Sequence, residues 1–160
     1  HRHTQGWQAC PRFALRHADR LTALGLFDVA LTPPVEQIGQ RALGRQAKAL
    51  LEQAGKPMVA MRKSWRFYEN RDAAFKAHTA HEVEPDTSQM LGALGVPVLI
   101  VCGQQDMNLP EAERIAAATP GCAFHIMEMT GHASLFYRPD LFTSLIHAFG
   151  ADVDLQEATR

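Results

Sequence analysis

The hydrophobic pattern is clearest in the last third of the chain, where two apolar runs are each followed by polar residues. Residues Val96–Gly103 form a short apolar stretch rich in β-branched side chains, and Ala123–Met129 forms a second one. Such runs indicate strands buried on both faces, as in a parallel sheet. Between them, Leu109–Ala118 has helical features, with Pro110 near its start and acidic residues in its first turn. The pattern predicts a strand, a helix and a second parallel strand.

Other segments of the chain are typical of helices. Val35–Gln53 has helical spacing, and shorter helical stretches follow at Met58–Tyr68 and Asp72–His81. Near the end, Phe142–Phe149 has an apolar face, and we expect this helix to end at Gly150. The residues after that glycine are then expected to form a frayed tail.

Two residues with catalytic potential follow the predicted strands directly. Asp106 comes just after the first apolar run, and His132 comes just after the second. In open α/β sheets, binding and catalysis take place outside the carboxyl ends of the strands. An acid and then a histidine in such positions match the last two members of a Ser–Asp–His order. The alternative is that both are ordinary polar loop residues on a flavodoxin-like sheet.

The same region closely resembles the C-terminal part of the α/β-hydrolases. The resemblance rests on Pro-Val-Leu-Ile-Val-x-Gly-x-x-Asp, a helix, a strand and Gly-His, followed by Tyr137–Phe142 and an apolar helix. It implies an α/β fold, in which about three parallel strands with flanking helices form the C-terminal part of an α/β-hydrolase sheet. In this scheme Phe13–Leu21 is the helix after the nucleophile elbow, and Thr22–Asp28 is the next core strand.

The resemblance also implies a division of the chain into three parts. Residues 1–32 would be a partial core, residues 33–88 a helical lid, and residues 89–160 the C-terminal core. Lids decide which substrates enter a site and exclude water. In the lid, Met58, Trp65 and Tyr68 recur at helical spacing, and they are candidate substrate-binding residues. Such a stripe is also what ordinary helix packing produces.

The resemblance assigns catalytic roles to single residues. His132 would be the general base, and Asp106 would orient it and stabilise its cation. Counting back from the elbow helix in the family's spacing places Thr4 at the nucleophile position. The backbone N–H of Gln5 would then contribute to the oxyanion hole.

The elbow itself departs from the family's Gly-x-Ser-x-Gly pattern. Arg2 replaces the first glycine, Trp7 occupies a position where a small residue is usual, and Thr4 is β-branched. A threonine hydroxyl can act as a nucleophile when a base activates it. The alternative is that Thr4 only caps or starts the following helix.

The net charge, the hydrophobic runs and the cysteine content limit the kinds of partner and the cellular location that we expect. The chain has 160 residues and a formal net charge of −1, so it lacks the broad basic footprint of nucleic-acid binding. No apolar run approaches the length of a membrane span. Its 3 cysteines are widely spaced and odd in number, which favours free thiols and a cytoplasmic location over disulfides or a metal site. No cofactor is expected.

Two functions follow from these observations. The first is an α/β-hydrolase, or part of one, that cleaves a carboxylic ester or lactone through an acyl-enzyme. The second is a non-catalytic or degenerate α/β-hydrolase segment that binds a small ligand or completes a partner chain. By the family's plan, strands should precede Thr4, so we expect the chain alone to be catalytically incomplete. A complementary N-terminal segment or a homodimer would then be its partner.

Overall fold

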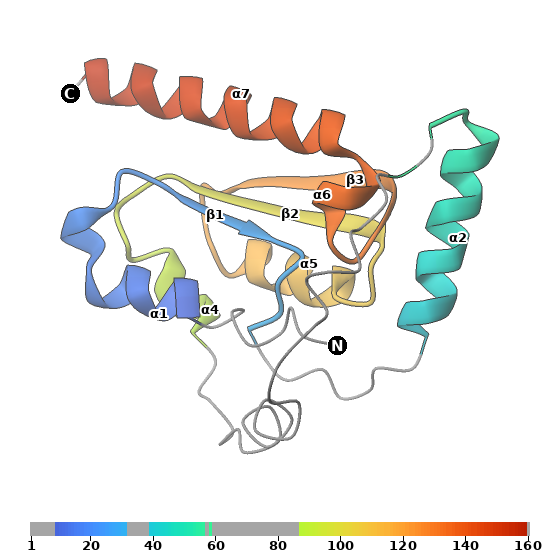
Figure 1. Ribbon diagram of the computed structural model, residues 1–160. Helices are drawn as coiled ribbons and strands as arrows, with labels where there is room; N and C mark the ends of the chain where they lie inside the picture. The colour runs from blue at the N-terminus through green and yellow to red at the C-terminus, as the bar shows by residue number, and fades with distance from the viewer. Residues whose placement is uncertain (1–8, 32–38, 57, 59–86, 160) are drawn as a thin grey trace, which may run out of the picture.

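Three apolar segments form the strands of one parallel sheet (Figure 1). The computed structural model describes residues 9–31, 39–56, 58 and 87–159. In this part of the chain the strands are β1 (Leu24–Phe27), β2 (Val98–Gln105) and β3 (Ala123–Gly131). Their order is β1-β2-β3, and both pairs are parallel. The α/β fold with three parallel strands is therefore confirmed.

Helices flank the sheet on both faces. They are α1 (Ala9–Arg16), the 3₁₀ turn η2 (Ala18–Arg20), α2 (Gln40–Gln53), α4 (Ser88–Leu91), α5 (Leu109–Ala117), α6 (Ser134–Tyr137) and α7 (Pro139–Ala158). α1, α4 and α5 lie on one face, and α7 crosses the other (Figure 1). α2 stands by the carboxyl ends of the strands, in contact with β3 and α6.

The side chains of β2 alternate between the two faces of the sheet, which explains why helices must cover both faces. Successive side chains of a strand point to opposite faces of the sheet. Val98, Ile100 and Cys102 are buried in the cluster formed with α1, α4 and α5. Leu99 and Val101 are buried on the other face, against residues of α7. The uninterrupted apolar part of β2, Val98–Cys102, is therefore buried on both sides, as its sequence indicates.

The first helix begins and ends earlier than the family resemblance indicates. The expected range is Phe13–Leu21, whereas α1 begins at Ala9 and η2 completes the segment. Pro11 lies in the first turn of α1, where a helix does not use that residue's N–H. It therefore does not mark a boundary. At the other end, His17 leaves the helical conformation with φ −134°, and the chain then turns toward β1.

The last helix is longer than the pattern predicts. The sequence indicates a helix over Phe142–Phe149 that ends at Gly150, but α7 continues to Ala158. An isolated glycine destabilises a helix by only about 1 kcal/mol relative to alanine. Val153, beyond the glycine, is 6% exposed, and its burial stabilises the extension. The expectation of a frayed tail is therefore wrong.

The predicted helix of the lid region is only partly described. Its expected range is Val35–Gln53, and α2 confirms the C-terminal end but begins at Gln40. Gly39 and Gly55 flank α2 with left-handed φ values of 103° and 65°, a conformation that does not continue a helix. Residues 35–38 and 59–86 lie outside the described residues. The lid as a whole therefore stays a prediction.

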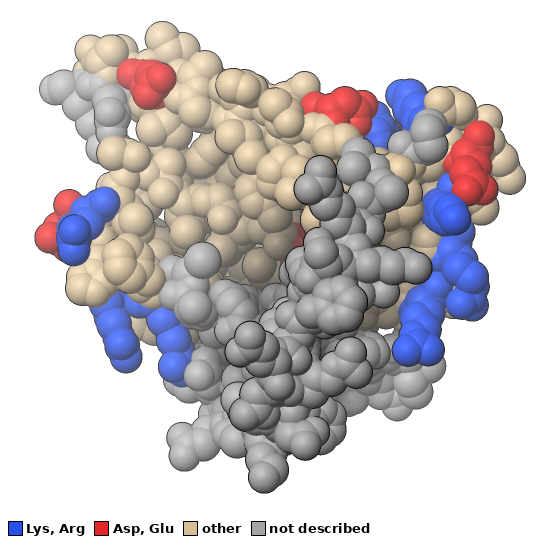
Figure 2. Space-filling view, in the orientation of Figure 1, with Lys and Arg blue, Asp and Glu red and all other residues tan. Residues whose placement is uncertain are grey.

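Among the residues coloured in Figure 2, charged side chains lie mainly at the margins of this face, and the tan surface between them carries few charges. Arg41, Arg45 and Lys48 are exposed along α2. Among the described cysteines, Cys102 and Cys122 are free thiols. None of the described helices has the length and apolar character needed to cross a bilayer.

The regular register between β2 and β3 is broken near their carboxyl ends. Gly103 lies opposite Met127, but Gln105 already lies opposite Gly131. β3 therefore contains extra residues, and one of them, Met129, has a left-handed φ of 55°. Irregularities of this kind redirect strand ends and are frequent beside active sites. Here the shift brings the residue after Gln105 beside the residue after Gly131.

Gly103 allows the two strands to approach at this irregularity. A Cβ at this position would overlap the carbonyl oxygen of Thr130 and would lie 2.8 Å from that of Gly131. Both obstacles are backbone atoms, so a side-chain rotation cannot relieve the overlap. The register shift therefore requires glycine at this point.

We expect Gly103→Ala to lower the free energy of unfolding by about 1–3 kcal/mol, because the added methyl group forces β2 and β3 apart. Gly150→Ala in α7 is the matched control, since a Cβ there meets nothing within 4 Å. It should be neutral or stabilising by up to about 1 kcal/mol. Urea unfolding of the three proteins measures both effects. Equal stabilities of Gly103→Ala and the unmodified protein would contradict the prediction.

Candidate functional site

β2 and β3 each present one candidate catalytic side chain at their carboxyl ends. Asp106 follows β2 directly, is 3% exposed, and accepts a hydrogen bond at Oδ1 from the backbone N–H of Asn108 at 3.0 Å. His132 follows β3 directly and is half-buried. The shifted pairing of Gln105 with Gly131 places these two residues side by side.

Asp106 and His132 are in direct contact. His132 Nδ1 lies 3.0 Å from Asp106 Oδ2, so the contact that the sequence predicts is confirmed. An ionised carboxylate only accepts hydrogen bonds, which places a proton on Nδ1 and leaves Nε2 as an acceptor. The Asp106 side chain is 0% exposed, whereas that of His132 is 17% exposed. Of the two side chains, the imidazole is therefore the one that a reacting group can reach.

The surroundings of His132 favour its protonated form. Burial alone would lower the pKa of His132. The hydrogen bond to Asp106 and the negative charges of Asp106 and Asp28 act in the opposite direction and outweigh burial, so the pKa is raised above its ordinary value of 6.5. A carboxylate that orients a histidine and stabilises its cation is the arrangement that general-base catalysis uses.

A second carboxylate, Asp28, lies close to this pair. It follows β1 directly, is 8% exposed and has a left-handed φ of 53°. Its Oδ2 accepts a hydrogen bond from the N–H of Ser134 at 2.6 Å, and its Oδ1 accepts one from the N–H of Gly103 at 3.3 Å. Its backbone carbonyl accepts a third from the side-chain amide of Asn108 at 3.1 Å. Asp28 therefore contacts the segments that carry both candidate catalytic residues.

The charge on Asp28 is unfavourable for folding. Burial, the largest cause, and the charge of Asp106 raise the pKa of Asp28 from 3.8 to about 6, although Ser134 hydrogen bonds and His132 act in the opposite direction. A raised carboxyl pKa means that the folded state binds this proton more tightly than the unfolded state. The corresponding stabilisation is present at acidic pH and is lost as the pH rises toward 6.

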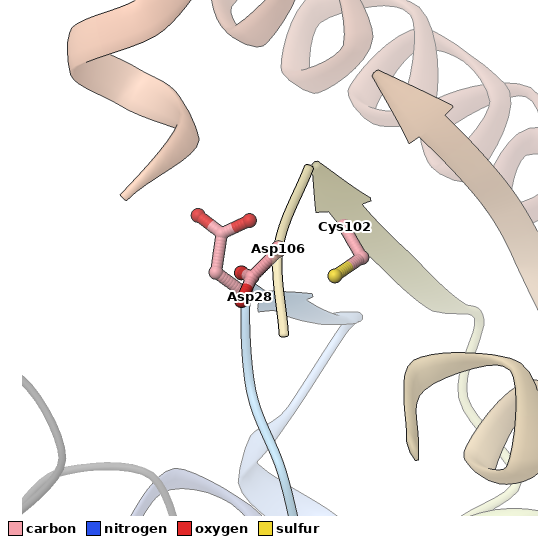
Figure 3. A group of neighbouring side chains, drawn as sticks. All are labelled: Asp28, Cys102 and Asp106. Atoms are coloured by element: carbon pink, nitrogen blue, oxygen red, sulfur yellow. The ribbon is translucent and has the colours of Figure 1, made fainter. Parts of the chain in front are cut away.

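Asp28, Cys102 and Asp106 offer ligand atoms within 4.8 Å of one another (Figure 3). Three of the four carboxylate oxygens already accept a backbone N–H, and the fourth faces His132. Burial and the charges of Asp106 and Asp28 raise the pKa of the Cys102 thiol far above its ordinary range, which disfavours the thiolate that a metal requires. The two carboxylates therefore serve as hydrogen-bond acceptors, and the group as a whole fits a metal ion poorly.

Tyr137 connects this edge of the sheet to α2. A Cβ at Gly131 would come within 2.9 Å of the Tyr137 ring, so the ring packs directly on the end of β3. The Tyr137 hydroxyl donates to the carbonyl oxygen of Gly44 in α2 over 3.5 Å. Burial and the charge of Asp106 raise the pKa of Tyr137. α2 is thus held beside the segment that carries His132.

The remaining residues singled out in the sequence are not brought into this site by the described structure. Thr4, Gln5, Trp65 and Tyr68 lie outside the described residues. Met58 is described; it is half-buried and is not part of a helix. The roles of nucleophile, oxyanion donor and substrate-binding residue therefore stay predictions for these positions.

The sequence pattern did not single out three residues of this site, namely Asp28, Asn108 and Ser134. Asp28 carried a usable signal, because it is a carboxylate at the carboxyl end of the expected core strand Thr22–Asp28, much as Asp106 follows the apolar run before it. The rule that ligands gather at the carboxyl ends of parallel strands applies to both. Asn108 and Ser134 participate through a side-chain amide and a backbone N–H, and nothing in their sequence context distinguishes them.

The chain resembles solved structures of known proteins over most of its length. An esterase from Thermogutta terrifontis matches with 21% identity and a TM-score of 0.58, over 94% of this chain and 63% of the esterase. An enol-lactonase from Burkholderia xenovorans matches with 18% identity and a TM-score of 0.62, over 92% of this chain and 63% of that protein.

A third match is a structure from a study of carboxylesterases of Nitrososphaera gargenis, with 16% identity and a TM-score of 0.64 over 96% of this chain and 64% of that one. Comparison of the sequence with protein-family models and with curated proteins gave no match. The chain thus spans less than two thirds of the length of these structures. Their common architecture, together with the parallel sheet and its flanking helices, shows that this chain has the α/β-hydrolase fold.

Proposed function

We propose that the protein is an α/β-hydrolase that cleaves a carboxylic ester or a lactone through an acyl-enzyme. The observation that carries this proposal is the 3.0 Å contact between His132 and Asp106 at the carboxyl edge of a parallel sheet. The raised pKa of His132 supports a role in proton transfer. The similarity to an esterase and an enol-lactonase favours ester and lactone bonds as the substrate class.

In the proposed reaction, Nε2 of His132 accepts the proton of a hydroxyl nucleophile while the hydroxyl oxygen bonds to the substrate carbonyl carbon. Asp106 holds the ring through Nδ1 and stabilises the imidazolium. The imidazolium then donates its proton to the leaving alkoxide as the ester C–O bond breaks. Water, activated by the same histidine, hydrolyses the acyl-enzyme and regenerates the hydroxyl.

The remaining parts of the proposed site rest on the sequence. Thr4 is the candidate nucleophile, and the N–H of Gln5 is a candidate oxyanion donor. Met58, Trp65 and Tyr68, in the lid over residues 33–88, are candidates for the acyl or ring pocket. In the described part of the chain β1 pairs only with β2. We include in the proposal that an additional N-terminal segment or a second copy completes the sheet there.

The pH dependence of His132 tests its pairing with Asp106. We expect Asp106→Asn to lower the pKa of His132, because the substitution removes a charge and the acceptor that stabilise the imidazolium. In the unmodified protein, activity should fall as the pH decreases through the raised pKa of His132, because the protonated ring cannot act as a base. NMR titration of the imidazole measures the pKa without substrate.

Asp19→Asn is the control, because Asp19 is exposed in η2 and the substitution should leave the titration of His132 unchanged. An identical His132 titration in Asp106→Asn and the unmodified protein would show that the contact has no electrostatic consequence.

Hydrolysis of a short-chain nitrophenyl ester and of a simple lactone tests the activity. The protein is best expressed as the product of the entire reading frame that encodes this sequence. We expect His132→Ala to lower kcat by on the order of a thousandfold or more, because the proposed reaction uses His132 to take the nucleophile's proton. His147→Ala, at an exposed position of α7, should retain the rate.

Equal loss in the two variants would contradict a specific role for His132. If the unmodified protein hydrolysed neither substrate class, the result would favour the non-catalytic alternative, a segment that binds a small ligand or completes a partner chain.

A further inference from the structure

We propose that Asp28 is a positioning residue that holds together the two segments carrying Asp106 and His132. Its effect on catalysis rests on the proposed function, whereas its structural role rests on hydrogen bonds within the described residues. Asp28 directly follows β1, as the two candidate catalytic residues directly follow β2 and β3. A single carboxylate at the edge of the sheet thus connects all three strand ends.

The two oxygens of the Asp28 carboxylate serve different segments. Oδ2 accepts the N–H of Ser134, two residues after His132, and Oδ1 accepts the N–H of Gly103, three residues before Asp106. The donors are 106 and 75 positions from Asp28 in the sequence. Local chain geometry therefore does not create these contacts, and they fix the segments relative to each other.

The backbone of Asp28 adds a third connection. Its carbonyl oxygen accepts a hydrogen bond from the side-chain amide of Asn108, and the backbone N–H of Asn108 in turn donates to Asp106 Oδ1. One residue, Asn108, therefore connects Asp28 to the acid that orients His132. Asp28 thus contacts the segment that carries Asp106 through both its carboxylate and its main-chain carbonyl group.

A carboxylate in this position is unfavourable for the fold because it is almost fully buried. Its backbone adopts a left-handed conformation, which asparagine, aspartate and glycine tolerate best. Burial also raises the pKa of Asp28. Asparagine would satisfy the backbone and avoid the buried charge, but its side chain has only one acceptor oxygen. What a carboxylate adds is a second acceptor for a second N–H.

Small displacements at such a site have large effects on rate. A shift of about 1 Å between reacting groups can reduce a rate about a hundredfold. In the Asp28 network the short 2.6 Å bond from Ser134 is charge-assisted, and such bonds are stronger than those between neutral groups. Its loss should free the segment after β3 and let the His132 ring move away from Asp106.

Asp28→Asn is the variant that tests this role. We expect amide hydrogen exchange at Ser134 to accelerate by about tenfold or more, because the opening of this segment no longer breaks a charge-assisted bond. The NMR signal of the Nδ1 proton of His132 should broaden as the contact with Asp106 loosens. In ester hydrolysis, kcat should fall by about a hundredfold, while KM changes by less than about twofold.

Asp152→Asn is the matched control, because it makes the same chemical change at an exposed carboxylate of α7. It should leave all three readouts unchanged. Unchanged exchange at Ser134 in a folded Asp28→Asn protein would overturn the proposal. So would a sharp Nδ1 proton signal with full kcat.

A measurement on the unmodified protein covers the case in which Asp28→Asn does not fold. The Ser134 amide proton should be protected from exchange, and its chemical shift should titrate together with the Asp28 carboxyl group. An amide proton that is not protected from exchange would contradict the proposal. So would an amide proton whose chemical shift stays constant while Asp28 titrates. These NMR readouts need no substrate, so failure of ester hydrolysis would remove the proposed function and leave the positioning role of Asp28 intact.

Discussion

The site depends on the shifted pairing that places Gln105 of β2 opposite Gly131 of β3. With the regular register of the preceding residues, Asp106 would lie beside a residue of β3, and His132 would be farther along the chain. The extra residues in β3 change this, and they fit only because Gly103 has no side chain to meet the backbone of that strand. One strand irregularity thus sets the 3.0 Å contact between the acid and the histidine.

Around this contact the protein places charge where burial makes it unfavourable. Asp106 is fully covered, and Asp28 is nearly so. Backbone N–H groups stabilise both carboxylates. Asp106 accepts from Asn108, and Asp28 accepts from Gly103 within β2 and from Ser134 after β3. In a low-dielectric interior such groups must be hydrogen-bonded, and the satisfied network then holds its members rigidly. Of these three side chains, the imidazole of His132 is the partly exposed one. A proton acceptor must be within reach of the reacting group, so this exposure suits that role.

The sequence predicts the sheet and the central pair well, because long apolar runs and polar residues just after them are strong local signals. It predicts helix ends poorly. The helix that the resemblance starts at Phe13 begins at Ala9, and Gly150 suggested an end that the burial of Val153 overrides. The role of Asp28 was also missed, because its contacts arise from residues more than seventy positions away. Contacts between residues so far apart in the chain produce no hydrophobic periodicity from which they could be predicted.

The most direct test of the central claim is covalent labelling with a fluorophosphonate, which reacts with hydroxyl nucleophiles that a neighbouring base activates. Intact-mass measurement should show one adduct on the unmodified protein, and its formation should be much slower in both His132→Ala and Asp106→Asn. Peptide mapping then identifies the labelled hydroxyl. Labelling at the same rate in the unmodified protein and His132→Ala would contradict the account, because the nucleophile would then be activated without the pair that the structure assembles.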